Sequence, residues 1–234
     1  MAGFQEGFRN NEVRYYPVIL LLDVSGSMDG EPIKALHDAV TEMVNSFAAQ
    51  RTREKMIKVA IITFGGDNAN LHLTYTDAPD LQANGIPHFN ANGMTPLGDA
   101  LKKAKTLIED KSTTPGKWYC PAVVVVSDGA PNDEWQRPLQ DFINNGRTAK
   151  CIRIGVPIGT GADVNMMERF TGDRAMIFYA QDVSSIADAF KNVALSISKS
   201  HDKAKTIDAQ PTVKRDISTT VKRPTRHDDD EDDD

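Results

Sequence analysis

The sequence predicts an α/β fold, in which a doubly wound, mostly parallel six-stranded sheet carries one antiparallel edge strand and helices on both faces. Three observations support this. Continuous apolar runs such as Val18–Leu22 and Ala122–Val126 are typical of strands buried on both faces in a parallel sheet. Segments with apolar residues at helical spacing alternate with such runs from residue 16 to about 200. The segment Leu71–Thr76 alternates apolar and polar residues, as a half-buried edge strand does.

The expected elements follow one another through short connections, with one exception. Strands are expected at 16–23, 57–64, 71–76, 122–126, 151–157 and 175–179, and helices at 33–47, 95–108, 134–144, 164–170 and 183–197. The connection 77–94 is rich in Pro, Gly and Asn and is expected to be irregular. Loops longer than about 12–15 residues are uncommon unless they are functional, so this one is a candidate part of a site. The helix after it is expected to open at Thr95 and Pro96, with Pro at the first helical position.

Composition and charge exclude several classes of protein. The chain has 234 residues, of which 40% are hydrophobic and 26% charged, so it can bury a sizeable core. The net charge of −6 gives no electrostatic argument for binding nucleic acid or a membrane. No run approaches the roughly 20 apolar residues of a membrane span, and the N-terminus holds no apolar stretch of signal-peptide length. Cys120 and Cys151 lie beside or within expected strands, which predicts buried, reduced thiols and a cytoplasmic location.

Three regions are expected: an N-terminal segment 1–12, a folded domain 13–200 and a flexible, disordered charged tail 201–234. The tail holds no aromatic residue and only six aliphatic ones, too few to offset the entropy of ordering it. Residues 201–226 carry seven Lys and Arg against three Asp, and the last seven residues are all acidic. Thr212 and Thr220 each begin a TVKR segment and are candidate phosphorylation sites; the alternative is an inert solvated extension.

Polar residues follow two expected strands and precede one helix. Asp23, Ser25 and Ser27 lie where the first strand ends, Asp128 follows the run AVVVVS, and Thr95 opens the helix after the long loop. Ligands of open α/β sheets bind outside the carboxyl ends of the strands. We therefore expect these five residues to lie at one edge of the sheet and to bind a metal ion there.

The donor types favour a small, hard cation. Mg²⁺ prefers octahedral oxygen coordination, keeps several waters and takes one or two carboxylates, which Asp23 and Asp128 can supply. Mn²⁺ and Ca²⁺ are alternatives, whereas the absence of Cys and His from these segments argues against zinc. A site with so little negative charge leaves the metal able to accept a carboxylate from another molecule.

The DVSGS segment at 23–27, Thr95 in GMT and Asp128 in SDG together resemble the metal-ion-dependent adhesion site of von Willebrand factor A (vWA) domains. That pattern is DxSxS, then a threonine, then an aspartate, in this order. The resemblance covers about residues 13–200 and implies a non-catalytic module that grips an Asp or Glu of a protein partner through Mg²⁺. The contact surface is expected at 27–31, 84–96 and 129–136.

Within that family, the chain looks most like the bacterial tellurite-resistance-associated (TerY-like) members, which implies a role in stress or antiphage response. It also implies a Ser/Thr kinase and a PP2C-type phosphatase as partners. Some members carry a cysteine-rich zinc module after the domain, where this chain has its charged tail.

Other readings of the same residues remain open. Asp23, Ser25 and Ser27 are also ordinary helix N-capping residues. An Asp after the first strand begins haloacid-dehalogenase-type phosphohydrolase sites as well, but those need a second Asp where this chain has Ser25. Nucleotide binding is disfavoured because the chain contains no GxxxxGK[ST] and no GxGxxG after a strand.

Several nearby residues have two interpretations. Asp29 and Asp99 either support the metal site or are solvated surface carboxylates. His88 either touches a partner or is an ordinary loop histidine, and the five histidines show no metal-ligand spacing. Trp135 either stands on the binding face or, like Trp118, packs in the core.

Overall fold

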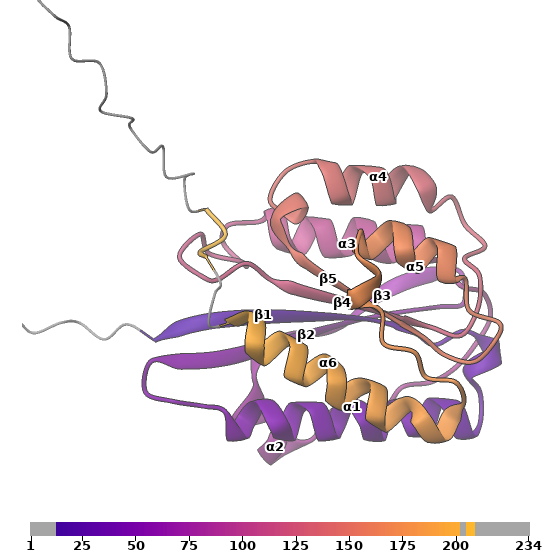
Figure 1. Ribbon diagram of the computed structural model, residues 1–234, viewed down its shortest axis with the longest axis horizontal. Helices are drawn as coiled ribbons and strands as arrows, with labels where there is room; N and C mark the ends of the chain where they lie inside the picture. The colour runs from indigo at the N-terminus through magenta and orange to yellow at the C-terminus, as the bar shows by residue number, and fades with distance from the viewer. Residues whose placement is uncertain (1–12, 202–204, 209–234) are drawn as a thin grey trace, which may run out of the picture.

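The computed structural model describes residues 13–201 and 205–208, and its centre is a five-stranded sheet (Figure 1). The strands are β1 (Arg14–Asp23), β2 (Lys55–Gly65), β3 (Asn68–Asp77), β4 (Ala122–Ser127) and β5 (Ile152–Pro157). They lie in the order β3-β2-β1-β4-β5, and all neighbours are parallel except β2 and β3. β1 is therefore central, with its last eight residues buried, and the antiparallel edge strand is the one that alternation predicted.

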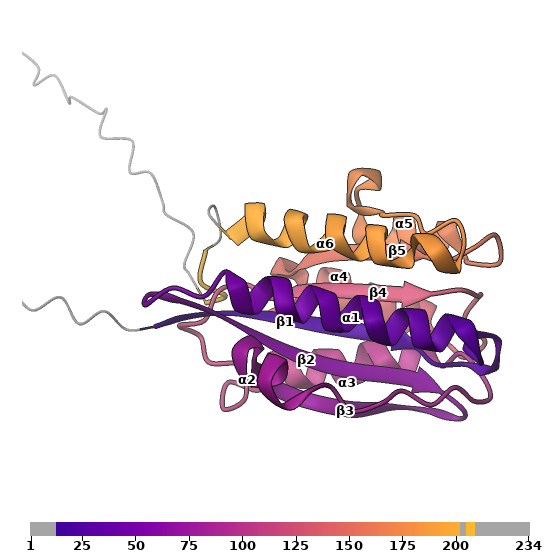
Figure 2. The ribbon, with the colours of Figure 1, turned by 90° about the horizontal axis from the view of Figure 1, so that it is seen from below.

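Six α-helices cover the two faces of the sheet within the described residues. They are α1 (Glu31–Ala49), α2 (Ala78–Asn84), α3 (Leu97–Glu109), α4 (Gln136–Asn144), α5 (Val164–Thr171) and α6 (Ile186–His201). α1, α2 and α6 lie on one face and α3, α4 and α5 on the other (Figures 1 and 2). Alternate residues of β1 explain this: Val18, Leu20 and Leu22 belong to the first core, and Ile19 and Leu21 to the second.

The prediction of six strands is wrong by one. Residues 175–179 were expected to be a strand, but Arg174–Met176 form a 3-10 turn capped by the side chain of Asp173. Beyond it, only isolated bridges join Ile177 to Gly155 and Ala180 to Ile158. The carbonyls of Gly155 and Pro157 accept hydrogen bonds from Phe178 and Ala180, so both β5 residues face this segment. Pro157 has no N–H to donate, which explains why the ladder is incomplete.

Two smaller expectations also need correction. The connection 77–94 is not wholly irregular, because α2 forms its first part. Pro96 does not occupy the first turn of α3 but the position before it. The residues from Gly85 to Pro96 still form a long, non-helical connection that ends at the carboxyl edge of the sheet.

Residues 205–208, called the strap below, pack against the opposite end of the sheet. The strap pairs with residues 118–120 through bonds from Cys120 N–H to Lys205 O (3.0 Å) and from Ile207 N–H to Trp118 O (2.9 Å). The Ile207 side chain is fully buried. The packed part of the described chain therefore extends to Asp208, eight residues past the expected domain end. The remaining tail, with Thr212 and Thr220, lies outside the described residues, as does the segment 1–12.

Two further expectations concern the thiols and the membrane. Cys120 and Cys151 are both unpaired; Cys151 is buried, but Cys120 is only half-buried. Among the described residues, no helix is long and apolar enough to cross a membrane.

Candidate metal site

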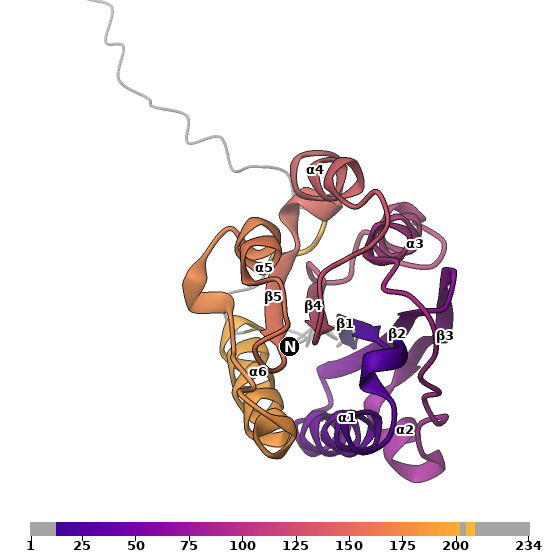
Figure 3. The ribbon, with the colours of Figure 1, turned by 90° about the vertical axis from the view of Figure 1, so that its right-hand side faces the viewer.

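The five residues expected to bind metal lie at the edge where the parallel strands end, which faces the reader in Figure 3. Asp23 is the last residue of β1, and Asp128 directly follows β4, its neighbour in the sheet. Ser25 and Ser27 lie between β1 and α1, and Thr95 lies two residues before α3. Sheet order therefore brings together segments more than 100 positions apart.

Asp23 is a fully buried carboxylate held by two donors. Its Oδ1 accepts a hydrogen bond from the Ser25 N–H (2.9 Å), and its Oδ2 accepts one from the Ser127 hydroxyl (2.5 Å). Burial raises the pKa of Asp23, the bonds from Ser127 and Ser25 lower it, and the nearby Asp128 adds to the rise. A buried anion in this position gains from a cation beside it.

A chain of oxygen atoms leads from this buried group to the surface. The Ser25 and Ser27 hydroxyls are 3.1 Å apart, and the Ser27 hydroxyl donates to Asp128 Oδ1 at 2.9 Å. Ser25 is buried, Asp128 is half-buried and Ser27 is exposed. The serines of the DxSxS segment and the aspartate after β4 therefore form one polar cluster that reaches solvent.

Backbone hydrogen bonds fix the loop that carries Thr95 against the same segment. Asn92 N–H donates to Val24 O (2.8 Å), Gly26 N–H to Gly93 O (3.0 Å), and Gly66 N–H to Asn92 O (2.7 Å). A Cβ on Gly93 would lie 2.6 Å from the Gly66 Cα, and the φ of Gly93 is +59°. Glycine is thus required there by both space and conformation. Thr95 follows two residues later and is buried.

Three residues that organise the site were not predicted from the sequence. Ser127 holds Asp23, and Asn132 accepts the Thr95 N–H at 3.0 Å. Asp133 accepts the N–H groups of Gly98 and Asp99, both at 3.0 Å. Because Pro96 at the N-cap offers no side-chain acceptor, the first N–H groups of α3 take a cap from 35 residues away. A helix start without its own capping residue was the signal that could have suggested this.

The residues with two interpretations are now placed. Asp29 is exposed, whereas Asp99 accepts the Ala69 N–H (2.9 Å) and so fixes the β2–β3 turn. Trp135 and Trp118 are both buried, and Arg169 lies over the Trp135 ring.

The histidines are not all scattered. His88 stacks on His37 with ring centroids 4.8 Å apart. His72 and His37 each contact the Phe89 ring, and burial and His88 lower the pKa of His37. Three of the five histidines therefore gather beside the long loop.

The donor set suits a hard cation. Within the described ranges, no group of three or more His, Cys, Asp or Glu is placed to hold a metal ion. A cation at this edge would therefore need hydroxyl oxygens; those of Ser25 and Ser27 lie in the polar cluster with Asp128, and Thr95 is the third candidate. Oxygen-only donors with two carboxylates match the preference of Mg²⁺.

Comparison with known proteins bears on the same segments. Residues 18–130, which include all five candidate ligands, match the family model of the von Willebrand factor type A domain. The described part of the chain has the vWA fold. Over 112 residues it is 33% identical to the uncharacterised protein Rv2850c of Mycobacterium tuberculosis. That match covers 48% of this chain and 17% of the relative, so the chain corresponds to a small part of that protein.

Solved structures share the vWA fold at low identity. Proximal thread matrix protein 1 of the mussel byssus, with a zinc-occupied metal-ion-dependent adhesion site, aligns with a TM-score of 0.62 at 15% identity, over 80% of this chain and 46% of that one. The von Willebrand factor type A protein of Catenulispora acidiphila gives 0.59 at 16% identity (79% and 43%). The manganese-loaded TRAP protein of Plasmodium vivax gives 0.56 at 20% identity (79% and 74%). The chain spans less than half of the first two structures.

Proposed function

We propose that this vWA domain is a non-catalytic, metal-dependent interaction module, which binds Mg²⁺ through Asp23, Ser25, Ser27, Thr95 and Asp128 and grips an acidic side chain of a protein partner. The observation that carries the proposal is the hydrogen-bonded path from buried Asp23 through Ser25 and Ser27 to Asp128. The zinc- and manganese-loaded vWA proteins of similar fold support a divalent cation in general.

The residues divide the task by their exposure. The two oxygens of Asp23 already accept hydrogen bonds from the protein, so Asp23 supplies negative charge from the buried side of the cation and fixes the Ser25 backbone. Ser27 and Asp128 lie toward solvent and would meet the cation where a partner can approach. The bound cation would supply positive charge for the partner's carboxylate. Asn132 holds the backbone N–H of Thr95, and we assign the Thr95 hydroxyl to the cation.

A phosphohydrolase fits the same site less well. The position two residues after Asp23 is Ser25, whose hydroxyl contacts Ser27. Across the described residues, the side-chain hydrogen bonds of Asp23, Ser25, Ser27 and Asp128 involve serine groups and one backbone N–H, without a His or Lys. A general base would have to lie within hydrogen-bond reach of the reacting group. The proposal therefore assigns binding and no catalytic step.

The wider setting rests on the resemblance to tellurite-resistance-associated members. We propose on that basis a cytoplasmic protein in a bacterial stress or antiphage response, with a Ser/Thr kinase and a PP2C-type phosphatase as partners and with Thr212 and Thr220 as the kinase's targets. Phosphoproteomics on stressed native cells tests the last part; unmodified Thr212 and Thr220 under every stress would remove it.

The site itself is tested by Mg²⁺-dependent thermal stabilisation of the chain and of Asp128→Asn. A ligand at 100 times its Kd stabilises the folded state by about 2.7 kcal/mol. For a domain of this size that corresponds to a rise in Tm of roughly 5–11 °C. Asp128→Asn should lose most of this rise while unfolding normally in chelator, because the Asp128 side chain is half-buried and, among the described residues, its one hydrogen bond comes from Ser27.

Asp29→Asn is the matched control, since Asp29 is exposed in the same loop as the serines. It should keep the full Mg²⁺ response. An equal response in Asp128→Asn and Asp29→Asn would refute the site. To test the role of the Asp23 charge, Asp23→Asn is preferable to Asp23→Ala, because the Asn side chain can still form hydrogen bonds with Ser25 and Ser127.

A further inference from the structure

The two ends of the domain carry opposite charge. At the edge with the candidate metal site, the loops 24–30, 66–67, 92–96, 128–135, 158–163 and 180–182 contain seven acidic residues and no Lys or Arg. The acidic residues are Asp29, Asp67, Asp128, Asp133, Glu134, Asp163 and Asp182. A divalent cation would neutralise only part of this charge. A partner that brings one carboxylate to the metal must therefore be basic around it.

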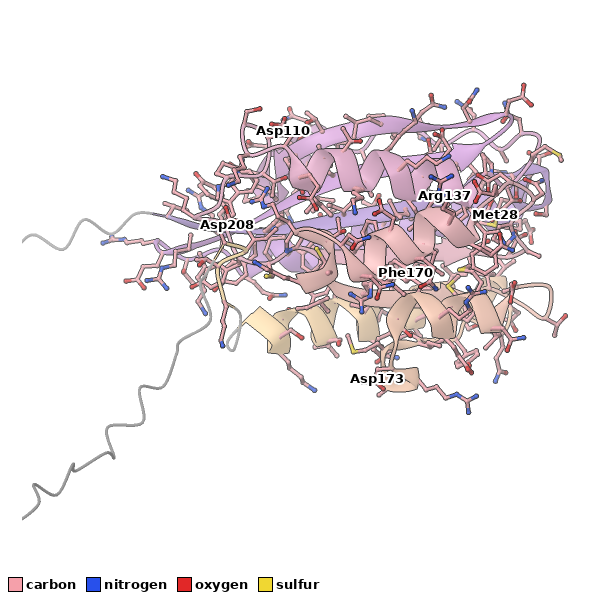
Figure 4. The ribbon with its side chains drawn as sticks, turned by 90° about the horizontal axis from the view of Figure 1, so that it is seen from above. Met28, Asp110, Arg137, Phe170, Asp173 and Asp208 are labelled. Carbon is pink, nitrogen blue, oxygen red and sulfur yellow. The ribbon has the colours of Figure 1, made fainter. Side chains whose placement is uncertain are left out.

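The opposite end of the domain is basic. The loops 50–54, 110–121 and 145–151 together with the strap 205–208 contain seven Lys and Arg against three acidic residues, a net of +4. The basic residues are Arg51, Arg53, Lys111, Lys117, Arg147, Lys150 and Lys205. Figure 4 shows Asp110 and Asp208 at this end and Met28 at the other.

The strap fixes where the remaining chain begins. Asp208 pairs with the buried Arg147 (3.1 Å) and with Lys111 (3.7 Å), and Lys150 donates to Ile207 O (3.0 Å). Residues 209–234 therefore start from the basic end, the one farthest from the candidate metal site.

The sequence that follows the strap combines positive charge with one carboxylate, which is what the acidic edge requires of a partner. Residues 209–226, called the arm below, contain five Lys and Arg and a single acidic residue, Asp216, which directly follows Lys214 and Arg215. The last seven residues, 228–234, also offer carboxylates, but all seven are acidic, so the acidic edge repels them. Within residues 209–234, Asp216 is therefore the carboxylate that has positive charge beside it.

The arm is too short for Asp216 to reach the metal site of its own copy. Asp216 lies eight positions after Asp208, and a fully extended chain covers at most about 3.6 Å per position, or about 29 Å. The nine steps from the first to the last residue of β1 already span about 30 Å in a straight line, and the arm would have to follow a longer path around the helices that cover the sheet. Because of this detour, Asp216 falls short of the site of its own copy, whereas the site of a second copy is within its reach.

We propose that copies of this chain associate head to tail, with the arm of one copy lying on the acidic edge of the next and Asp216 completing the coordination of its metal ion. The inference rests on the proposed metal site and names its partner as a second copy. Such a contact joins two different surfaces, so it builds a ring when the rotation closes and a filament when it does not.

Sedimentation velocity of the full chain at low ionic strength, in Mg²⁺ and in chelator, tests this. Wild type should associate with rising concentration in Mg²⁺ and dissociate in chelator. Asp216→Asn should weaken association by about tenfold or more, corresponding to about 1.4 kcal/mol per tenfold. Asp229→Asn removes one carboxylate from the acidic end and is the matched control, which should associate as wild type does.

A mixing experiment gives a sharper result. Asp128→Asn lacks a competent metal site but keeps the arm, and Asp216→Asn keeps the site but lacks the carboxylate. At a concentration just sufficient for wild type to associate, each alone should stay largely monomeric, whereas their mixture should form a heterodimer in Mg²⁺. A labelled peptide of residues 209–226 should also bind the Asp216→Asn chain in Mg²⁺, and the same peptide with Asn at 216 should not.

The outcomes separate this inference from the proposed function. The head-to-tail contact is overturned if Mg²⁺ stabilises a wild type that stays monomeric. It is also overturned if wild type and Asp216→Asn associate equally. Either result leaves the metal site in place. Absence of any Mg²⁺ stabilisation overturns both. Association that persists in chelator shows a purely ionic contact and also refutes the role of Asp216.

Discussion

Replacement of Ile207 by alanine tests whether the strap belongs to the folded domain. Ile207 is fully buried and belongs to the core that α3, α4 and α5 cover. Ile-to-Ala substitutions in cores cost about 2–5 kcal/mol. A central value of about 3 kcal/mol lowers the Tm of a domain of this size by roughly 6–12 °C.

The assay is thermal unfolding followed by circular dichroism, at low protein concentration and in chelator so that metal-dependent contacts do not contribute. Ile217→Ala is the matched control, because it changes the same residue type in the part of the tail predicted not to pack. It should shift the Tm by no more than a degree or two. Asp208→Asn should have an intermediate effect of about 1 kcal/mol, since it leaves Arg147 without its carboxylate but Asp208 itself is one-third exposed.

A Tm for Ile207→Ala within one degree of wild type would refute the reasoning. The strap would then lie on the domain without contributing to its core, and the end at residue 200 expected from composition would hold. A chain ended after residue 204 should show at least the loss seen for Ile207→Ala, because it also removes both backbone hydrogen bonds to residues 118–120.

Three further outcomes are expected. Thr95→Ala should weaken binding of an acidic partner more than it weakens Mg²⁺ stabilisation; an equal loss of both, measured by titration calorimetry and thermal shift, would contradict this division. Gly93→Ala should lower the Tm and reduce the Mg²⁺ response together, because a Cβ there meets Gly66 and the φ is positive; an unchanged Tm would show that the loop yields freely. Since the pKa of His37 is lowered in the folded state, its contribution to stability is present above the ordinary value of about 6.5 and is lost as pH falls below it. His37→Phe keeps a ring against His88 and Phe89 and should flatten the Tm-against-pH curve between pH 5 and 7; an unaltered slope would assign the dependence to other groups.

Most of the fold follows from local patterns in the sequence. The apolar runs of β1 and β4 indicated strands buried on both faces, and alternation in 71–76 indicated the antiparallel edge strand. Pattern alone could not show that Pro157 interrupts pairing with residues 175–179, because the missing N–H matters only once the neighbouring segment is known.

The candidate site likewise combines residues that the sequence predicts with residues that only the fold reveals. Asp23, Ser25, Ser27, Thr95 and Asp128 were predicted to share one edge because of their positions at strand and helix ends, and the structure places them there. The contacts made by Asn132 and Asp133 span 34–37 residues, and that of Ser127 spans 104. The strap depends on Arg147, 61 positions away from Asp208. Such pairs have no local signature, so they appear only when the fold brings the segments together.

The contact between Gly93 and Gly66 has a consequence for how sequences diverge. At Gly93 the limit is the Gly66 backbone, and at Gly66 it is a positive φ together with the Asn92 side chain, so exchange for even the smallest side chain is expected to be rejected in any chain that keeps this loop connection. Asp29 or Met94, which are exposed nearby, are free to vary without that penalty. A search for distant relatives with the same site should therefore weight the glycine two residues before the threonine as heavily as the DxSxS letters themselves. A sequence with every oxygen donor in place but alanine at that glycine is expected to lack the loop conformation that positions its threonine at the site.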